Sequence, residues 1–314
     1  MSVPKRLLQV MELARALAGN SSVVPGPLRI EIPEDLLHPV PAPVVAPLLA
    51  NAAFLAPLIH ALPSPFLAGV ERTAREHDLW LDLSVVLPHA AAHLPPSLLE
   101  RTARLHIDVP AGTGADEAAP VLAALAKPLR GSLELSVATG VEEPEALLQW
   151  VALAGTAASA TKLAFVPQSE GARWTLRAAQ RDLATAAHAA GIGLQLPNGF
   201  CLAPLRAPDP LDSWNILHQC LRSLLALHPE ICPFPFLMLR VTSAGAFGAC
   251  PVAKGPQLPR GPGAHSSDVA MGLRAAFLAG KPPPACTGCT LRVHVTESLG
   301  HEAGFVPART CLEV

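Results

Sequence analysis

Short runs in which apolar and polar residues alternate recur between residues 25 and 200, separated by stretches with helical spacing. From Leu105 to Val109 the apolar residues occupy every second position, with His106 and Asp108 between them. Successive side chains of a strand point to opposite faces, so this pattern predicts a strand with one apolar and one polar face. The strands predicted in this way span residues 28–32, 79–85, 105–109, 132–137, 162–166 and 191–196.

Apolar positions three or four residues apart predict helices between these strands. A proline directly after Glu143 and the segment beginning at Trp174 are both interpreted as helix starts. Alternation of strands and helices indicates an α/β fold with parallel strands and right-handed crossovers. About six strands are too few for a closed eight-unit barrel, so we expect a partial (β/α) barrel. The predicted helices span residues 65–77, 116–127, 143–155 and 174–190.

The character of the chain changes after residue 200, where prolines cluster and cysteines begin to appear. We therefore expect a barrel domain over residues 1–205 and a small cysteine-rich module over residues 206–314. Within the module, the pattern predicts a helix over 212–228, a hairpin between Cys232 and Cys250, and a helix over 267–279 that ends at Gly280.

Charge and composition exclude several classes of protein. The net charge is −2 and no basic run or basic helix face occurs, so no nucleic acid partner is expected. Residues 36–70 lack Asp, Glu, Lys and Arg but contain seven prolines, which oppose a membrane-spanning helix. No signal peptide is recognised at the N-terminus, so we expect a cytoplasmic protein with no membrane partner.

Four of the seven cysteines occur as two pairs in the last third of the chain. Cys232 and Cys250 flank the predicted hairpin, whereas Cys286 and Cys289 form a Cys-x-x-Cys motif. Clustered cysteines in a reducing compartment are commonly metal ligands, and four thiolates suit tetrahedral zinc or an iron–sulfur cluster. We interpret Cys201 and Cys220 as small buried residues, with Cys311 as a reserve ligand or a simple C-terminal thiol.

The two cysteine segments carry a family resemblance. The Cys-x12-Gly-x4-Cys spacing from Cys232 to Cys250, with Pro-Phe after the first cysteine, resembles the opening of the SPASM or twitch extension of radical SAM enzymes. The stretch Leu-Ala-Gly-Lys-Pro-Pro-Pro-Ala-Cys-Thr-Gly-Cys, ending at Cys289, is similar to its return segment. The resemblance implies one auxiliary [4Fe–4S] cluster on Cys232, Cys250, Cys286 and Cys289. Residues 27–32 and 162–167 resemble strands of the radical SAM barrel, and Trp174 begins a similar helix.

The chain departs from that family after the first strand. Radical SAM enzymes carry Cys-x3-Cys-x2-Cys there, whereas residues 33–43 contain no cysteine, and neither does any position before Cys201. The glycine-rich stretch that holds the methionine amino group is also missing. We therefore expect a degenerate radical SAM-like protein that neither binds nor cleaves S-adenosylmethionine (SAM). It would act as an iron–sulfur accessory protein to an active radical SAM enzyme, in peptide or cofactor maturation, with that enzyme or a peptide substrate as partner.

Two alternatives from other classes remain open. The barrel could retain a catalytic site that needs no SAM, or zinc could merely stabilise the C-terminal module as a binding unit. Polar residues on predicted strands are the candidates for a residual site, although polar residues on a solvated strand face are commoner. These candidates are Glu31, Asp82, His106, Asp108, Glu134 and Gln195.

Overall fold

The part of the chain that the computed structural model describes falls into two compact units. The first unit is built from residues 1–60, 64–82 and 213–296, and the second from 61–63, 83–212 and 297–314. The described residues are 29–39, 41, 42, 45–50, 52–59, 64–87, 93–140, 143–157, 159–202, 238–241, 247, 248, 275–277, 279–282 and 284–286.

The strands are hydrogen-bonded in the order β10-β9-β1-β2-β3-β4-β5-β6-β7-β8. Eight of them, β9 and β1 to β7, form a parallel sheet, whereas the edge strands β10 and β8 are antiparallel to their neighbours. Strands β1 to β7 follow one another in chain order, without the reversal that defines a doubly wound sheet. Their bounds are β1 Arg29–Pro33, β2 Phe54–Leu58, β3 Trp80–Val86, β4 Thr102–Val109, β5 Ser132–Thr139, β6 Ala160–Pro167, β7 Gly193–Gln195, β8 Cys201–Leu202, β9 Met238–Val241 and β10 Phe247–Gly248.

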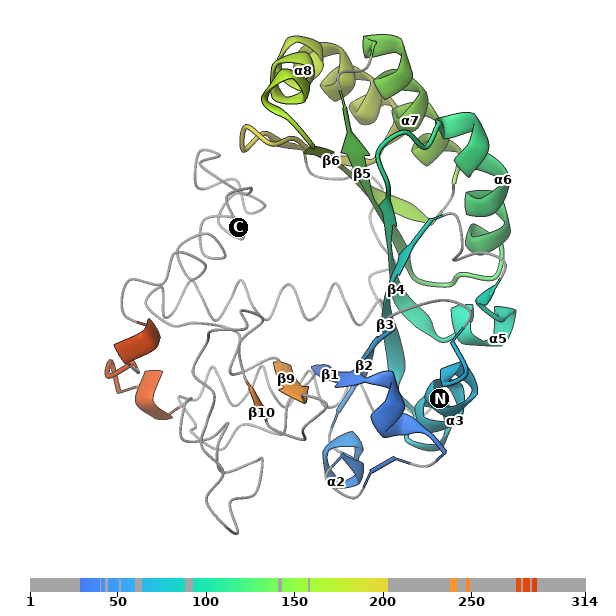
Figure 1. Ribbon diagram of the computed structural model, residues 1–314, viewed down its shortest axis with the longest axis vertical. Coiled ribbons are helices and arrows are strands. Elements are labelled where there is room, and N and C mark those ends of the chain that lie inside the picture. Colours follow the sequence, from blue (N-terminus) through green and yellow to red (C-terminus); the bar gives the residue numbers. More distant parts are fainter. Residues whose placement is uncertain are drawn as a thin grey trace. The chain divides into compact units, whose positions relative to one another are not determined.

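Helices connect successive strands, as expected for an α/β fold. In the second unit α6 joins β4 to β5, α7 joins β5 to β6, and α8 joins β6 to β7. Right-handed crossovers that advance in one direction place all their helices on one face, and Figure 1 shows α6, α7 and α8 on the same side of β4, β5 and β6. The helix bounds are η1 Glu34–Leu37, α2 Ala46–Leu49, α3 Leu67–Glu76, α5 Pro96–Leu99, α6 Ala115–Ala126, α7 Pro144–Thr156, α8 Glu170–Ala190 and η2 Pro284–Cys286.

The alternation predicted for β4 is confirmed. Leu105, Ile107 and Val109 are at most 1% exposed, whereas His106 is half-buried and Asp108 is exposed. Each fully buried aliphatic side chain contributes about 1.5–3 kcal/mol through removal from water. The apolar face therefore anchors the helices, and the polar residues occupy the opposite face of the strand.

Helix α8 begins four residues earlier than predicted. Ser169 is its N-cap, and the Ser169 hydroxyl accepts a hydrogen bond from the backbone amide of Ala172 at 3.1 Å. The helix therefore starts at Glu170, and Trp174 lies in its second turn rather than at its start. At the other end, Gly191 adopts the left-handed conformation, with φ of 72°, that ends many helices.

The structure corrects the expected number of strands. Strand β2, which the alternation did not predict, pairs in parallel with β1 through Ile30 and Leu55. Its sequence, Phe-Leu-Ala-Pro-Leu, is uniformly apolar and contains Pro57, which is unusual in a central strand. Residues 36–70 therefore include a buried strand. Within the described parts of the chain, no helix has both the length and the apolar character needed to cross a membrane.

The hairpin predicted in the C-terminal third is confirmed in its central part. Strand β9 is antiparallel to β10, with Val241 opposite Phe247 and Arg240 opposite Gly248. On its other side β9 pairs in parallel with β1, so that Arg240 lies opposite Glu31. The hairpin is therefore continuous with the sheet of the first unit. The predicted helix over 212–228 lies outside the described residues, and the division at residue 205 stays a prediction.

Candidate functional site

A buried network of ion pairs lies across β1, β3 and β9 in the first unit. The Nε of Arg29 donates to Asp82 Oδ2 at 2.6 Å, and its Nη1 lies 3.2 Å from Glu31 Oε2. Glu31 also forms an ion pair with Arg240. The carboxylate side chains are only 7% exposed for Glu31 and 1% for Asp82.

The geometry of this network favours a structural role. Two carboxylates, Glu31 and Asp82, face two guanidinium groups, so the four formal charges cancel. Arg29 lies between the two carboxylates and pairs with both, so Glu31 and Asp82 are not placed as an adjacent acid–base pair. Ion pairs satisfied in this way stabilise one arrangement of buried strands, and removing one partner leaves an unpaired buried charge.

A second polar group, called the β4–β5 cluster, lies in the second unit. It consists of His106 and Asp108 on β4 and Glu134 and Ser136 on β5, with Arg104 beside them. The strand register places His106 opposite Glu134 and Asp108 opposite Ser136. His106 Nε2 lies 3.2 Å from both Asp108 Oδ1 and Ser136 Oγ, and its Nδ1 lies 3.8 Å from Glu134 Oε2. Arg104 Nη1 is 3.6 Å from the same Glu134 oxygen.

The charges of this cluster shift two pKa values strongly. Burial alone would lower the pKa of His106, but the hydrogen bond to Asp108 and the nearby carboxylate of Glu134 outweigh it and raise the pKa from 6.5 to about 9. Burial alone would raise the pKa of Glu134. The nearby His106 and the charges of Arg104 and Lys162 outweigh that effect and lower the pKa to about 2.

These pKa values decide what the β4–β5 cluster can do. A general acid or base works best when its pKa lies near the working pH. At pH 7 His106 is protonated, because its pKa of about 9 lies above that pH. Glu134 is ionised, because its pKa of about 2 lies well below it. The pair therefore holds fixed charge at neutral pH, and Glu134 is a poor proton acceptor there. This arrangement favours a positioning or structural role over proton transfer.

The structure brings together only some of the predicted polar residues. Glu31 and Asp82 meet through Arg29, and His106, Asp108 and Glu134 meet directly. Gln195 lies opposite Ala164 of β6, so a whole strand separates it from β5.

Five charged or polar partners of these clusters were not predicted from the sequence. Arg29 and Arg104 each lie two positions before a predicted residue on the same strand, so the two-residue period would have identified them. Ser136 follows the same rule after Glu134. Lys162 and Arg240 carry no such local signal, because they reach their partners through pairing between strands.

Of the four predicted thiolate ligands, only Cys286 lies among the described residues. It ends η2 and is half-buried, while Cys232, Cys250 and Cys289 lie outside the described part of the chain. Among the described residues, no group of three or more His, Cys, Asp and Glu side chains is arranged to hold a metal ion. The four-thiolate site therefore stays a prediction.

The segment before Cys286 has the local structure that was predicted. Residues 275–277 are helical, and Gly280 follows with φ of 65°. The amide of Gly280 donates to the carbonyl of Phe277 at 3.0 Å, and that of Lys281 donates to Ala276 at 2.9 Å. These two bonds define a Schellman motif, which ends the helix and turns the chain toward Cys286.

Comparison of the sequence with protein-family models and with curated proteins yields no match.

Proposed function

We propose that this chain is an iron–sulfur accessory protein of radical SAM type that has lost the SAM-cleaving cluster. Its barrel would be partial, and its partner would be an active radical SAM enzyme that matures a peptide or cofactor. The sheet supports this proposal because parallel strands in chain order, with helices on one face, are what a (β/α) barrel requires.

The region after β1 argues against an independent radical SAM activity. A catalytic cluster would need three thiolates in the loop after this strand, but β1 runs directly into η1 and residues 34–53 contain no cysteine. The first cysteine of the chain is Cys201. The side chains at this position are therefore unable to hold an iron–sulfur cluster through thiolates.

The observation that carries the proposal is the pair of local structures beside the four cysteines. Cys232 precedes β9 and Cys250 follows β10, so the two residues flank an antiparallel hairpin. The Schellman motif at Gly280 ends a helix just before Cys286, and Cys289 follows three residues later. Both local structures were predicted from the segments that resemble a SPASM or twitch module.

The donor set fits a [4Fe–4S] centre. Four thiolates from Cys232, Cys250, Cys286 and Cys289 match the number of ligands that such a cluster takes, and the same set would also suit zinc. A bound cluster would supply one-electron transfer, whereas zinc would supply only folding energy. The chain's own contribution would be two thiolates that flank the hairpin in sequence and two that follow the helix end at Gly280.

The ligand assignment is tested with cysteine variants prepared without air. Cys286→Ser and Cys289→Ser should abolish the broad absorbance near 400 nm that iron–sulfur proteins show, and Cys220→Ser should leave it unchanged. Incubation of the reconstituted protein with SAM and dithionite should release no 5′-deoxyadenosine. Retention of the absorbance in both ligand variants would refute the assignment, and SAM cleavage would refute the claim of a lost catalytic centre.

A further inference from the structure

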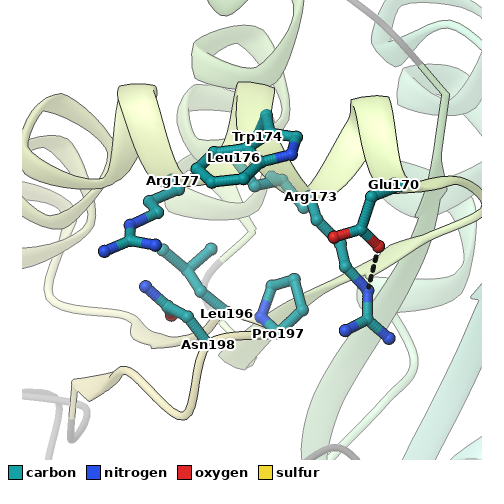
Figure 2. A pocket seen from close by; sticks show the side chains of 8 residues that line it. All are labelled: Glu170, Arg173, Trp174, Leu176, Arg177, Leu196, Pro197 and Asn198. Carbon is teal, nitrogen blue, oxygen red and sulfur yellow. Dashed lines mark ion pairs between the residues drawn. The ribbon is translucent and has the colours of Figure 1, made fainter.

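A hollow in the second unit lies between the first turns of α8 and the loop after β7. Leu176, Leu196 and Pro197 form its apolar part, and Arg173 and Arg177 stand at its rim (Figure 2). Its volume is about 180 Å³. Because α8 follows β6 and the loop follows β7, the hollow lies at the carboxyl end of these parallel strands, the edge where ligands of α/β proteins commonly bind.

The loop that forms one wall of the hollow is held by its own hydrogen bonds. The amide of Leu196 donates to Phe200 at 2.9 Å, and the side chain of Asn198 donates to Gln180 of α8 at 2.5 Å. Asn198 also accepts a bond from the Phe200 amide at 3.2 Å. These contacts tie the loop to the helix, so the hollow is formed before any ligand arrives.

Trp174 is unusually exposed beside this hollow. Its side chain is 61% exposed, and among the described residues only one other large hydrophobic residue is exposed to a comparable degree. The guanidinium carbon of Arg177 lies 5.6 Å from the centre of its ring. Exposed tryptophan and arginine side chains of this kind are the residues that most often dominate the energy of protein interfaces.

Positive charge continues along the same face of α8. Arg173, Arg177 and Arg181 are four residues apart and exposed, and like charges at this spacing destabilise a helix. Arg173 lies 3.8 Å from Glu170, whereas Arg177 and Arg181 form no ion pair with another described residue. The repulsion between these arginines is therefore offset within the helix only by the Arg173–Glu170 pair and by the contact of Arg177 with Trp174.

We propose that this surface binds an acidic peptide segment that carries an apolar side chain between its acidic residues. The apolar side chain would enter the hollow beside Trp174, and the carboxylates would pair with Arg173, Arg177 and Arg181. The hollow is smaller than the roughly 300–1,000 Å³ of typical small-molecule sites, so it suits one or two side chains of a longer ligand. The choice of a peptide rests on the proposed accessory role.

A nucleic acid could in principle use the same chemistry, because bases stack on tryptophan and phosphates pair with arginine. The lining of the hollow favours the peptide. Beside the charged Glu170, Arg173 and Arg177 it contains four apolar side chains, which suit Leu or Phe better than a sugar–phosphate chain: Trp174, Leu176, Leu196 and Pro197.

The proposal is tested by fluorescence anisotropy with the full-length protein. The probe is a fluorescein-labelled peptide, Glu-Asp-Glu-Phe-Leu-Glu-Asp-Glu. Arg177→Glu and Trp174→Ala should each weaken its binding about tenfold or more. Arg130→Glu, which reverses an exposed arginine elsewhere in the same unit, should leave the affinity unchanged. Replacement of Phe-Leu by Ser-Ser in the probe should weaken binding to a similar degree.

Absence of binding, or equal binding by the Arg177 and Arg130 variants, would overturn the proposal. Tighter binding of a labelled octauridylate with the same dependence on Trp174 would assign the site to nucleic acid and would also overturn it. Absorbance near 400 nm is recorded on the same samples. If the protein shows the absorbance but does not bind the peptide, only this inference is refuted. If the protein is colourless but binds the peptide, only the proposed cluster is refuted.

Discussion

Substitution of His106 by glutamine should remove a pH-dependent part of the stability of the second unit. In the folded protein the imidazolium is surrounded by Asp108, Glu134 and Ser136, with the positive charges of Arg104 and Lys162 beside Glu134. These contacts raise the pKa of His106 to about 9 from its ordinary 6.5. Glutamine keeps a hydrogen-bonding side chain but cannot become charged.

The size and sign of the effect follow from the two pKa values. A difference between about 9 and 6.5, at 1.36 kcal/mol per pH unit, corresponds to about 3 kcal/mol. Because the folded pKa of His106 is raised, this stabilisation is fully present below pH 6.5. It declines as the pH rises and is lost above about pH 9.

Urea unfolding of both proteins between pH 6 and 10 measures this contribution. The wild-type protein should exceed His106→Gln in free energy of unfolding by several kcal/mol at pH 6, and the excess should shrink by about 3 kcal/mol by pH 10. Groups that titrate alike in both proteins change both free energies of unfolding equally, so their effects cancel in the difference. A difference that does not change with pH, or an NMR titration of His106 with an ordinary pKa, would refute the reasoning.

Two further pairs of substitutions, each with a matched control, test the packing of the chain by urea unfolding. Asp82→Ala should destabilise the first unit by about 3 kcal/mol because it leaves the buried network with two arginines and a single carboxylate, that of Glu31, whereas Ser84→Ala at an exposed position of β3 should change little. Gly131→Ala should lower the free energy of unfolding by about 3 kcal/mol or more, because the new Cβ would lie 2.1 Å from a backbone oxygen of β4. Gly140→Ala should change it little, because no atom lies within 4 Å of the Cβ position there. Equal effects in either pair would contradict the packing described.

The strands that the sequence predicted correctly have one apolar and one polar face. In β4 and β5, every second residue is buried against the helices, so the two-residue period is visible in the sequence. Strand β2 lacks this signal because four of its five residues are buried and Pro57 interrupts the pattern expected of a central strand.

The polar clusters were predictable only in part, because their geometry depends on pairing between distant segments. Glu31 and Arg240 are separated by about two hundred residues and meet only because β9 pairs with β1. No local period contains that information. Likewise, the early start of α8 depends on the hydroxyl of Ser169, a capping signal that the sequence contained and that was overlooked in favour of Trp174.

The most direct test of the account is the iron and acid-labile sulfide content of the protein after anaerobic reconstitution. The account predicts about four iron and about four sulfide per chain, and loss of both in Cys289→Ser. One zinc per chain, or no bound metal in a protein prepared without air, would contradict it.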